Sequence, residues 1–296
     1  MHIFIQKFGI KVLVTTHSPS TIALCPEDSI YELKNHEASS LEKISKDDAL
    51  QLLTGFIPTL SLDYKNHKQI FVESPTDVEF YQTIHDKLQQ DKKLSNKLYF
   101  ISNALGKGNS TLVCETVNSI RHSGNKTSYG IIDWDLKSDP TDNIYVHGYN
   151  ERYSVENFVL DPVYLICLLL DMDDAHNISK ELKFGSAYNQ FSIGNETNER
   201  LQEISNYVFD QLKKEFPVYK KETETIEISY INGKSILWPK WYAQMQGHQL
   251  EEKLRKVFTA LNKFSGEGVL QNKISLIIGK CYPFVPSSTV ELLESI

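Results

Sequence analysis

The chain has little that would suit a membrane protein, a disulfide framework or a zinc site. Its longest strongly apolar stretch runs from Val159 to Leu170 and is interrupted by Asp161 and Pro162. It is shorter than the roughly 20 residues that span a bilayer. The four cysteines lie far apart, without the close spacing of zinc ligands or redox pairs. We therefore expect no membrane span and four reduced thiols.

The chain also lacks a net positive charge, with 31 Lys and Arg residues against 38 Asp and Glu residues. The net charge is −7 over 296 residues, which argues against a protein that coats nucleic acid through its overall charge. A nuclease remains compatible with this balance, because catalytic carboxylates subtract from the total while local basic groups bind phosphate. The first residues lack the charged start and long apolar middle of a secretory signal. We expect a cytoplasmic protein.

Hydrophobic periodicity predicts an α/β fold with a parallel sheet. Between residues 65 and 156 we expect strands at 68–72, 97–102 and 128–132 and helices at 76–90 and 110–122. Such alternation is typical of parallel strands joined by right-handed crossovers. The remainder is mostly helical, with helices predicted at 163–170, 199–216, 249–264 and 269–280 and a hairpin strand at 225–231.

Two acidic clusters follow two of the predicted strands. Glu73 and Asp77 come after the first strand, and Asp133 and Asp135 come after the third. Because the carboxyl ends of parallel strands line one crevice, we expect these four carboxylates to converge. A hard divalent cation with oxygen ligands, most simply Mg²⁺, relieves their mutual repulsion. The pattern predicts a metal-dependent site that cuts phosphodiester bonds.

Both clusters have alternative interpretations. For the first cluster, the alternative is that Asp77 only caps a helix and that Glu73 is a surface residue. Acidic doublets such as Asp133-Trp-Asp135 also occur in phosphatases of the haloacid dehalogenase type and in glycosyltransferases. The phosphatase pattern places the doublet on the first strand, whereas here it follows the third. On an extended segment Asp133 and Asp135 point the same way, which disfavours both charges without a cation.

The spacing of these acidic residues resembles that of the Toprim domain of topoisomerases, primases and OLD-family nucleases. The likeness rests on Glu73, on Asp77 four residues later and on the Asp133-x-Asp135 pair, and it covers roughly residues 67–160. Ser74 stands where many Toprim domains have Gly. The resemblance implies that Glu73, Asp133 and Asp135 hold Mg²⁺ or Mn²⁺, and that Asp77 completes the metal shell or orients water.

A further segment, Tyr153-Ser-Val-Glu-Asn-Phe158, is similar to one in Toprim-like domains that accompany ATPases in bacterial anti-phage systems. There the Glu is an additional acidic site residue, which implies the same catalytic and metal-binding role for Glu156. The alternative is that Glu156 only stabilises the first turn of a helix. Topoisomerase activity is disfavoured, because none of the 15 tyrosines lies in a recognisable nucleophile context.

A glycine-lysine loop, Ala104-Leu-Gly-Lys-Gly-Asn-Ser-Thr111, follows the second predicted strand. It is not a Walker A motif, because no Gly lies five positions before Gly106. Its backbone amides and Lys107 suit a single phosphate at a helix start. Toprim-like proteins have a Gly-rich turn here, which implies that Lys107 contacts the scissile strand or balances charge in the transition state. An equally supported alternative is that Gly106 and Gly108 only form the turn.

The segment from Val12 to Ser20 resembles the switch-histidine strand of ABC-type ATPases, in which the His contacts the γ-phosphate. This implies a nucleotide-binding role for His17, which is otherwise a turn histidine. The chain has no Walker A, signature segment or Walker B, so ATP would act only through a partner ATPase or a missing upstream domain. The resemblance implies an ABC-type ATPase partner and a homodimer, since those ATPases work in pairs.

Basic and aromatic residues are interleaved between Lys213 and Lys256. Basic groups bind phosphates and aromatic rings stack on unpaired bases, so this composition indicates a nucleic-acid surface. Several glutamates dilute the signal, and we favour a core role for Trp238 and Trp241.

The sequence thus predicts the C-terminal remnant of an ABC-type ATPase domain at 1–64, a Toprim-like catalytic domain at 65–160 and a mainly helical accessory region at 161–296. We expect a Mg²⁺-dependent endonuclease of a bacterial defence system that acts on DNA. Two alternatives stay open: an RNase acting on structured RNA such as tRNA, and a non-catalytic subunit that docks an ATPase partner.

Overall fold

The computed structural model describes residues 12–18, 21–22, 25, 29–34, 40–53, 68–94, 96–102, 108–122, 125–172, 175–266, 268–281 and 284–296. The chain divides into two compact units, Met1–Leu62 and Asp63–Ile296. The expected regions 65–160 and 161–296 both fall within the second unit. All four cysteines are free.

The described part of the first unit includes a small hairpin and a helix. Strands β1 (Tyr31–Lys34) and β2 (Ser40–Lys43) pair antiparallel, and helix α3 spans Lys46–Leu53. The strand expected before His17 is not formed among residues 12–18, where the backbone has no strand partner and Leu13 is exposed. A strand needs a neighbour to satisfy its backbone hydrogen bonds.

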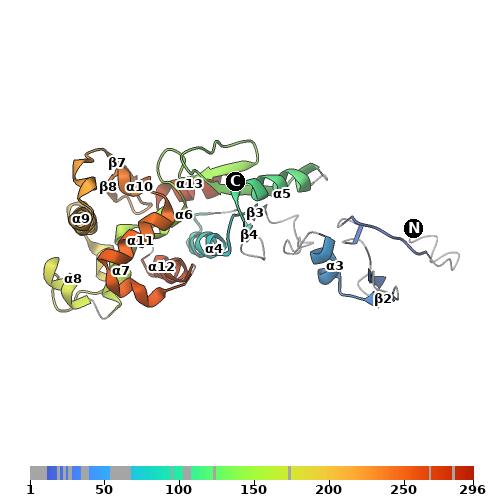
Figure 1. Cartoon of the computed structure of the whole chain (residues 1–296), viewed down its shortest axis with the longest axis horizontal. Coiled ribbons are helices and arrows are strands. Elements are labelled where there is room, and N and C mark those ends of the chain that lie inside the picture. The colour runs from blue at the N-terminus through green and yellow to red at the C-terminus, as the bar shows by residue number, and fades with distance from the viewer. Residues whose placement is uncertain are drawn as a thin grey trace. The chain divides into compact units, whose positions relative to one another are not determined.

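In the described part of the second unit, four strands form a parallel sheet with the order β4-β3-β5-β6 (Figure 1). They are β3 (Lys68–Phe71), β4 (Leu98–Ile101), β5 (Ser128–Asp133) and β6 (Ile144–His147). Neighbouring strands are parallel throughout. The prediction of an α/β fold with a parallel sheet flanked by helices is therefore confirmed.

Two crossover helices connect the first three strands. Helix α4 (Pro75–Gln90) joins β3 to β4, and α5 (Ser110–His122) joins β4 to β5. The chain moves from β3 to one side of the sheet and then returns past β3 to β5. With right-handed crossovers, this reversal places the two helices on opposite faces and makes the gap between β3 and β5 a topological switch point.

The rest of the unit is mainly helical. Its helices are α6 (Val155–Val159), α7 (Pro162–Leu170), α8 (Ala175–Glu181), α9 (Asn198–Glu215), α10 (Lys240–Ala243), α11 (Gly247–Val257), α12 (Val269–Lys280) and α13 (Ser287–Ser295). Short 3-10 helices span Ser192–Asn195, Pro217–Lys221 and Thr259–Phe264. The predicted helix at 249–264 is wrong in one respect: it breaks at Phe258 into α11 and a 3-10 helix.

The predicted strand at 225–231 becomes β7 (Thr225–Ser229), which pairs antiparallel with β8 (Ser235–Pro239). Gly233, with φ +78°, turns the chain between them. This hairpin is followed at once by α10.

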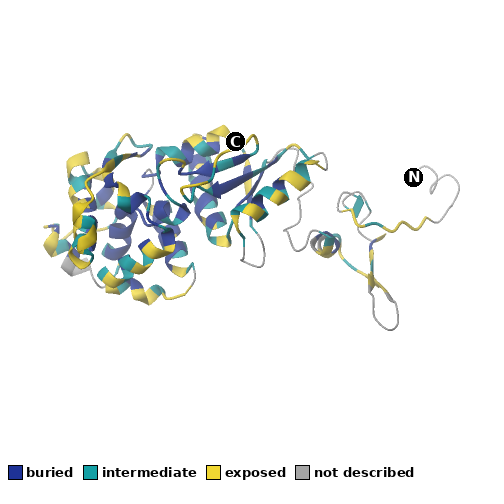
Figure 2. Ribbon diagram, turned by 45° about the horizontal axis from the view of Figure 1, so that its top comes forward, coloured by how far each residue is buried: buried dark blue, intermediate teal, exposed yellow. Residues whose placement is uncertain are grey.

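One hydrophobic core runs through the second unit (Figure 2). Helix α7 lies at its centre, with every residue from Pro162 to Leu169 buried. Helix α12 packs against both α7 and α4, so the helical region and the sheet share the same core. Among the described residues, no helix is long and apolar enough to cross a bilayer.

Candidate active site

The acidic residues that follow β3 and β5 come together at the switch point of the sheet. Glu73 lies two residues past the end of β3, and Asp133 is the last residue of β5. Because these strands are parallel neighbours, both residues reach the same edge. The Asp133 amide donates a hydrogen bond to Glu73 Oε1 over 3.1 Å.

Helix α6 brings Glu156 to this edge. The amide of Val155 donates to Asp133 Oδ1 over 2.9 Å, which ties the start of the helix to the end of β5. The Ser154 hydroxyl donates to Glu156 Oε2 over 2.6 Å. Glu156 is thus both a first-turn residue of α6, as its alternative interpretation expects, and a neighbour of the other carboxylates.

Asp77 reaches the site from the first turn of α4. Ser74, not Asp77, is the N-cap: its hydroxyl accepts from the Asp77 amide over 3.2 Å, while Asp77 Oδ2 accepts from the Ser74 amide over 2.9 Å. Pro75 occupies the first helical position, which suits its missing amide hydrogen. The Asp77 carboxylate therefore performs a capping role and is buried at the same time.

The carboxyl groups share one electrostatic environment. Burial, with added repulsion from Glu156 and Glu73, raises the pKa of Asp77 to about 7. Burial also raises the pKa of Asp133 well above its ordinary value, and Asp77, Glu156 and Glu73 add to the effect. The pKa of Glu73 is raised by burial, although the Asp133 amide opposes this. Charged carboxylates are disfavoured here unless a cation compensates them.

Asp135 is placed differently from the expectation of an extended segment. It lies beyond β5 in a tight turn, with φ +51° at Asp135 and +58° at Leu136, and the Lys137 amide donates to the Trp134 carbonyl over 3.0 Å. Two successive positive φ angles define a type I′ turn. The Asp135 amide donates to the Tyr153 carbonyl. Its charge still raises the pKa of Glu73.

Two glycines allow the site to close tightly. A Cβ atom on Gly108 would overlap the backbone carbonyl of Glu73. A Cβ atom on Gly247, at the start of α11, would lie 2.6 Å from Glu156 Cβ and 2.8 Å from Ser154 Oγ. Neither position accommodates a side chain unless its neighbours shift.

The two remaining predicted site residues are Lys107 and His17. Lys107 and the preceding loop residues 103–106 lie outside the described residues, so its role stays a prediction. His17 is exposed and belongs to the first unit. Glu73, Asp77, Asp133 and Glu156 are brought together, with Asp135 at their edge.

The donor chemistry of the cluster fits a hard divalent cation. It offers only carboxylate oxygens, and their raised pKa values reflect an excess of negative charge that such an ion offsets. Each carboxylate has two oxygens, so one can accept an amide while the other binds metal. Within the described ranges, however, no three His, Cys, Asp or Glu side chains are already arranged as metal ligands.

Residues far along the chain complete the wall of the site. The Asn157 side-chain amide donates to the carbonyls of Tyr242 and Met245, over 3.2 and 2.9 Å. The Tyr153 amide donates to the Ala243 carbonyl. Asn157 belonged to the Tyr-Ser-x-Glu-Asn segment, so the sequence offered a signal for it. The sequence offered no such signal for residues 242–247, which follow Asn157 by about 90 positions.

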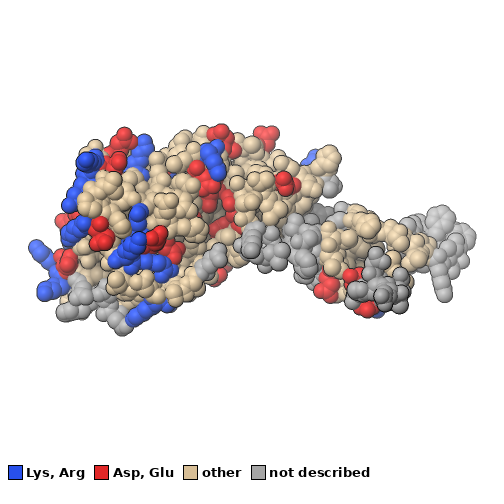
Figure 3. All heavy atoms as spheres, in the orientation of Figure 1, with Lys and Arg blue, Asp and Glu red and all other residues tan. Residues whose placement is uncertain are grey.

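The basic and aromatic stretch is largely structural. Trp238 is fully buried, which confirms its predicted core role. Trp241 is partly buried and stacks on Tyr219, with ring centroids 4.3 Å apart. Lys253 lies over the Phe216 ring. On the face shown in Figure 3, basic side chains gather over the helical region around α8, α9 and α11, and acidic ones lie nearer the sheet.

Comparison with models of known protein families and with curated protein sequences gives no match for this chain.

Proposed function

We propose that the chain is a metal-dependent nuclease that hydrolyses phosphodiester bonds at the acidic site between β3 and β5. The observation that carries the proposal is the convergence of Glu73, Asp77, Asp133 and Glu156 at the switch point, with burial and mutual repulsion raising the pKa values of the first three. Strained and like-charged groups of this kind cluster at functional sites.

Within this proposal the residues have distinct roles. Glu73, Asp133 and Asp135 hold the cation, and Glu156 completes its shell. A bound divalent cation would supply a water of lowered pKa and offset charge on the phosphate. Asp77, which is buried and accepts a hydrogen bond from the Ser74 amide, completes the metal shell or orients water. Ser154 positions Glu156 through its 2.6 Å hydrogen bond.

DNA is the proposed substrate, in a cytoplasmic bacterial defence role. Tyr31, Leu33 and Leu41 of the first unit are exposed apolar side chains, which suit a protein partner. That this partner is an ATPase rests on the resemblance of residues 12–20. Leu33 and Leu41 pair across the hairpin and so lie on one face of it. Exposed apolar surface of this kind marks interaction sites.

The test is cleavage of plasmid DNA and of total tRNA with Mg²⁺, Mn²⁺ or EDTA. Wild type should cut with metal and fail with EDTA, and the Glu73→Gln, Asp133→Asn double variant should lose cleavage. Asp142→Asn, an exposed acid between β5 and β6, is the matched control and should cut normally. Full cleavage by the double variant would overturn the proposal, as would a wild type that binds no Mg²⁺ by calorimetry.

A further inference from the structure

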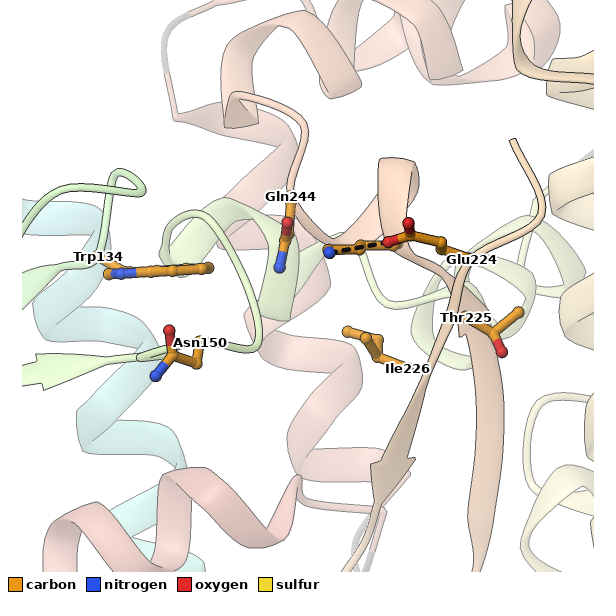
Figure 4. Close-up of a pocket in the computed structure, with 7 residues that line it drawn as sticks. Trp134, Asn150, Glu224, Thr225, Ile226 and Gln244 are labelled. Atoms are coloured by element: carbon orange, nitrogen blue, oxygen red, sulfur yellow. Dashed lines mark hydrogen bonds and ion pairs between the residues drawn. The ribbon is translucent and has the colours of Figure 1, made fainter. Parts of the chain in front are cut away.

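A groove of about 550 Å³ opens beside the acidic site. Figure 4 shows Trp134 and Asn150 on one side, Glu224, Thr225 and Ile226 on the other, and Gln244 above them. Its volume falls within the range of about 300–1,000 Å³ that small-molecule sites occupy. Trp134 lies in sequence between Asp133 and Asp135, so the groove begins one residue from the proposed metal ligands.

The turn that carries Trp134 fixes the indole at the groove. The Trp134 carbonyl accepts from the amides of Lys137 and Ser138, over 3.0 and 2.8 Å. Its ring and that of Tyr149 form an edge-to-face pair, with centroids 6.2 Å apart and planes at 64°. The indole extends into the groove, with the Gln244 side chain beyond its free end and the Asn150 side chain below it (Figure 4).

Asn150 stands on an anchored turn. Its φ is +59°, and the amides of Glu151 and Arg152 both donate to the Gly148 carbonyl. The Arg152 side chain is fully buried, with its guanidinium 4.3 Å from the ring centroids of both Phe158 and Trp238. This buried anchor holds the groove wall in place without any ligand.

The opposite wall comes from the β7–β8 hairpin and α10. The Lys240 ammonium pairs with Glu224 Oε2 over 2.9 Å, and the Lys240 amide donates to the Glu224 carbonyl. Gln244 lies one turn further along, and its backbone amide donates a hydrogen bond to the Lys240 carbonyl. The groove is thus built by two segments that are independently held.

An aromatic plane flanked by two side-chain amides matches a nucleobase. The ring offers a stacking surface, and Asn and Gln amides pair with the donor and acceptor edges of a base. Within a duplex the faces of a base are covered by stacked neighbours and its Watson–Crick edge by the partner base, so only an unpaired base presents both a face and that edge.

We propose that this groove holds an unpaired nucleobase of the strand whose phosphate lies at the acidic site. The substrate is then a single-stranded or locally opened nucleic acid. This inference rests on the proposed nuclease function for the position of the phosphate, but the binding of the base itself requires no metal.

The experiment measures binding of short single-stranded DNA and RNA oligonucleotides that carry 2-aminopurine, and of the matched duplexes, to the full chain in EDTA. The single strands should bind with quenched fluorescence, and the duplexes should bind at least about tenfold more weakly. Trp134→Ala should weaken single-strand binding about 10- to 100-fold. The stronger of the DNA and RNA arms identifies the source of the base.

Two further variants separate base binding from a disturbed acidic site. Gln244→Ala changes a residue on a different segment from Trp134. Asn150→Gly removes the side-chain amide but keeps the left-handed backbone that glycine tolerates. Each should weaken binding by about fivefold or more. Gln82→Ala, on α4 and paired with Asp86, is the matched control and should bind as wild type does.

The outcomes separate the two proposals. Quenched binding by a wild type that cuts nothing in Mg²⁺ would support the groove and overturn the nuclease. Metal-dependent cleavage with equal binding of single strands and duplexes, unchanged by Gln244→Ala and Asn150→Gly, would overturn the groove and leave the nuclease.

Discussion

Helices α3 and α4, one in each compact unit, begin with the same pattern of Ser, two residues and Asp. In α3 the pattern is Ser45 to Asp48, and in α4 it is Ser74 to Asp77. In both, the Ser hydroxyl accepts a hydrogen bond from the Asp amide, over 3.0 and 3.2 Å. The local chemistry that starts the two helices is therefore nearly identical.

The two aspartates nevertheless have different surroundings. Asp48 is exposed and accepts from its own Ser45 hydroxyl. Asp77 is only 8% exposed, and burial together with Glu156 and Glu73 raises its pKa to about 7. A capping motif thus sets where a helix begins, whereas the neighbours that the fold supplies decide whether its acid is buried among other carboxylates.

The largest contrast between the units should appear on removing apolar side chains. Leu168 is fully buried in α7, whereas Leu33 is 66% exposed in β1. We expect Leu168→Ala to lower the free energy of unfolding by about 2–5 kcal/mol, because it leaves a cavity. Leu33→Ala should change it by less than about 0.5 kcal/mol. Urea unfolding followed by far-UV circular dichroism, which reports on both units, measures both changes, and similar losses would show that β1 is covered in solution.

The two aspartates should also differ in how pH affects stability. The folded-state pKa of Asp77 is about 7, above its ordinary 3.8. Between these values the folded state keeps a proton that the unfolded state has released, so stability is present at low pH and falls as pH rises through the window. In EDTA, Asp77→Asn should reduce the drop in melting temperature from pH 5 to pH 8, while Asp48→Asn should leave it unchanged.

Added Mg²⁺ sharpens this test, since an ion that binds only the folded state raises its stability by mass action. The rise in melting temperature should be larger at pH 8, which is above the pKa of Asp77, than at pH 5, which is below it. Equal rises at the two pH values, or a pH dependence that Asp77→Asn leaves intact, would contradict the assignment of Asp77 to the site.

The smallest contrast concerns the caps themselves. Ser74→Ala should cost about 1 kcal/mol of unfolding free energy in the second unit, because the Asp77 amide at the start of α4 loses its acceptor, the Ser74 hydroxyl. Ser45→Ala should leave that unit's transition unchanged, since α3 belongs to the first unit. A comparable loss from both substitutions, measured by urea unfolding, would show that the two units unfold together.

Much of the sheet was predictable because its apolar runs and helical patterns alternate cleanly. Strands β3, β4 and β5 and helices α4 and α5 lie where the sequence predicts them, to within a residue or two at most ends. Strand β6 was not predicted: its four residues, Ile144–His147, contain only a short apolar pattern between polar turns. Such short segments carry little periodicity.

Only the part of the candidate site that follows from the direction of the strands was predictable. Parallel strand ends account for the meeting of Glu73 with Asp133. The left-handed turn at Asp135 and Leu136 was not predictable, because Leu rarely adopts positive φ. Nor was Gly247, because its contact with Glu156 depends on how α11 packs rather than on any local pattern.

The contact between Gly247 and Glu156 bears on how the protein can be divided and redesigned. A fragment that ends near residue 160 would contain every predicted carboxylate and still lack the backbone carbonyls of residues 242–245, to which Tyr153 and Asn157 donate. Transplanting the acidic motif into another protein therefore requires moving two distant segments as a pair, with glycine kept at position 247.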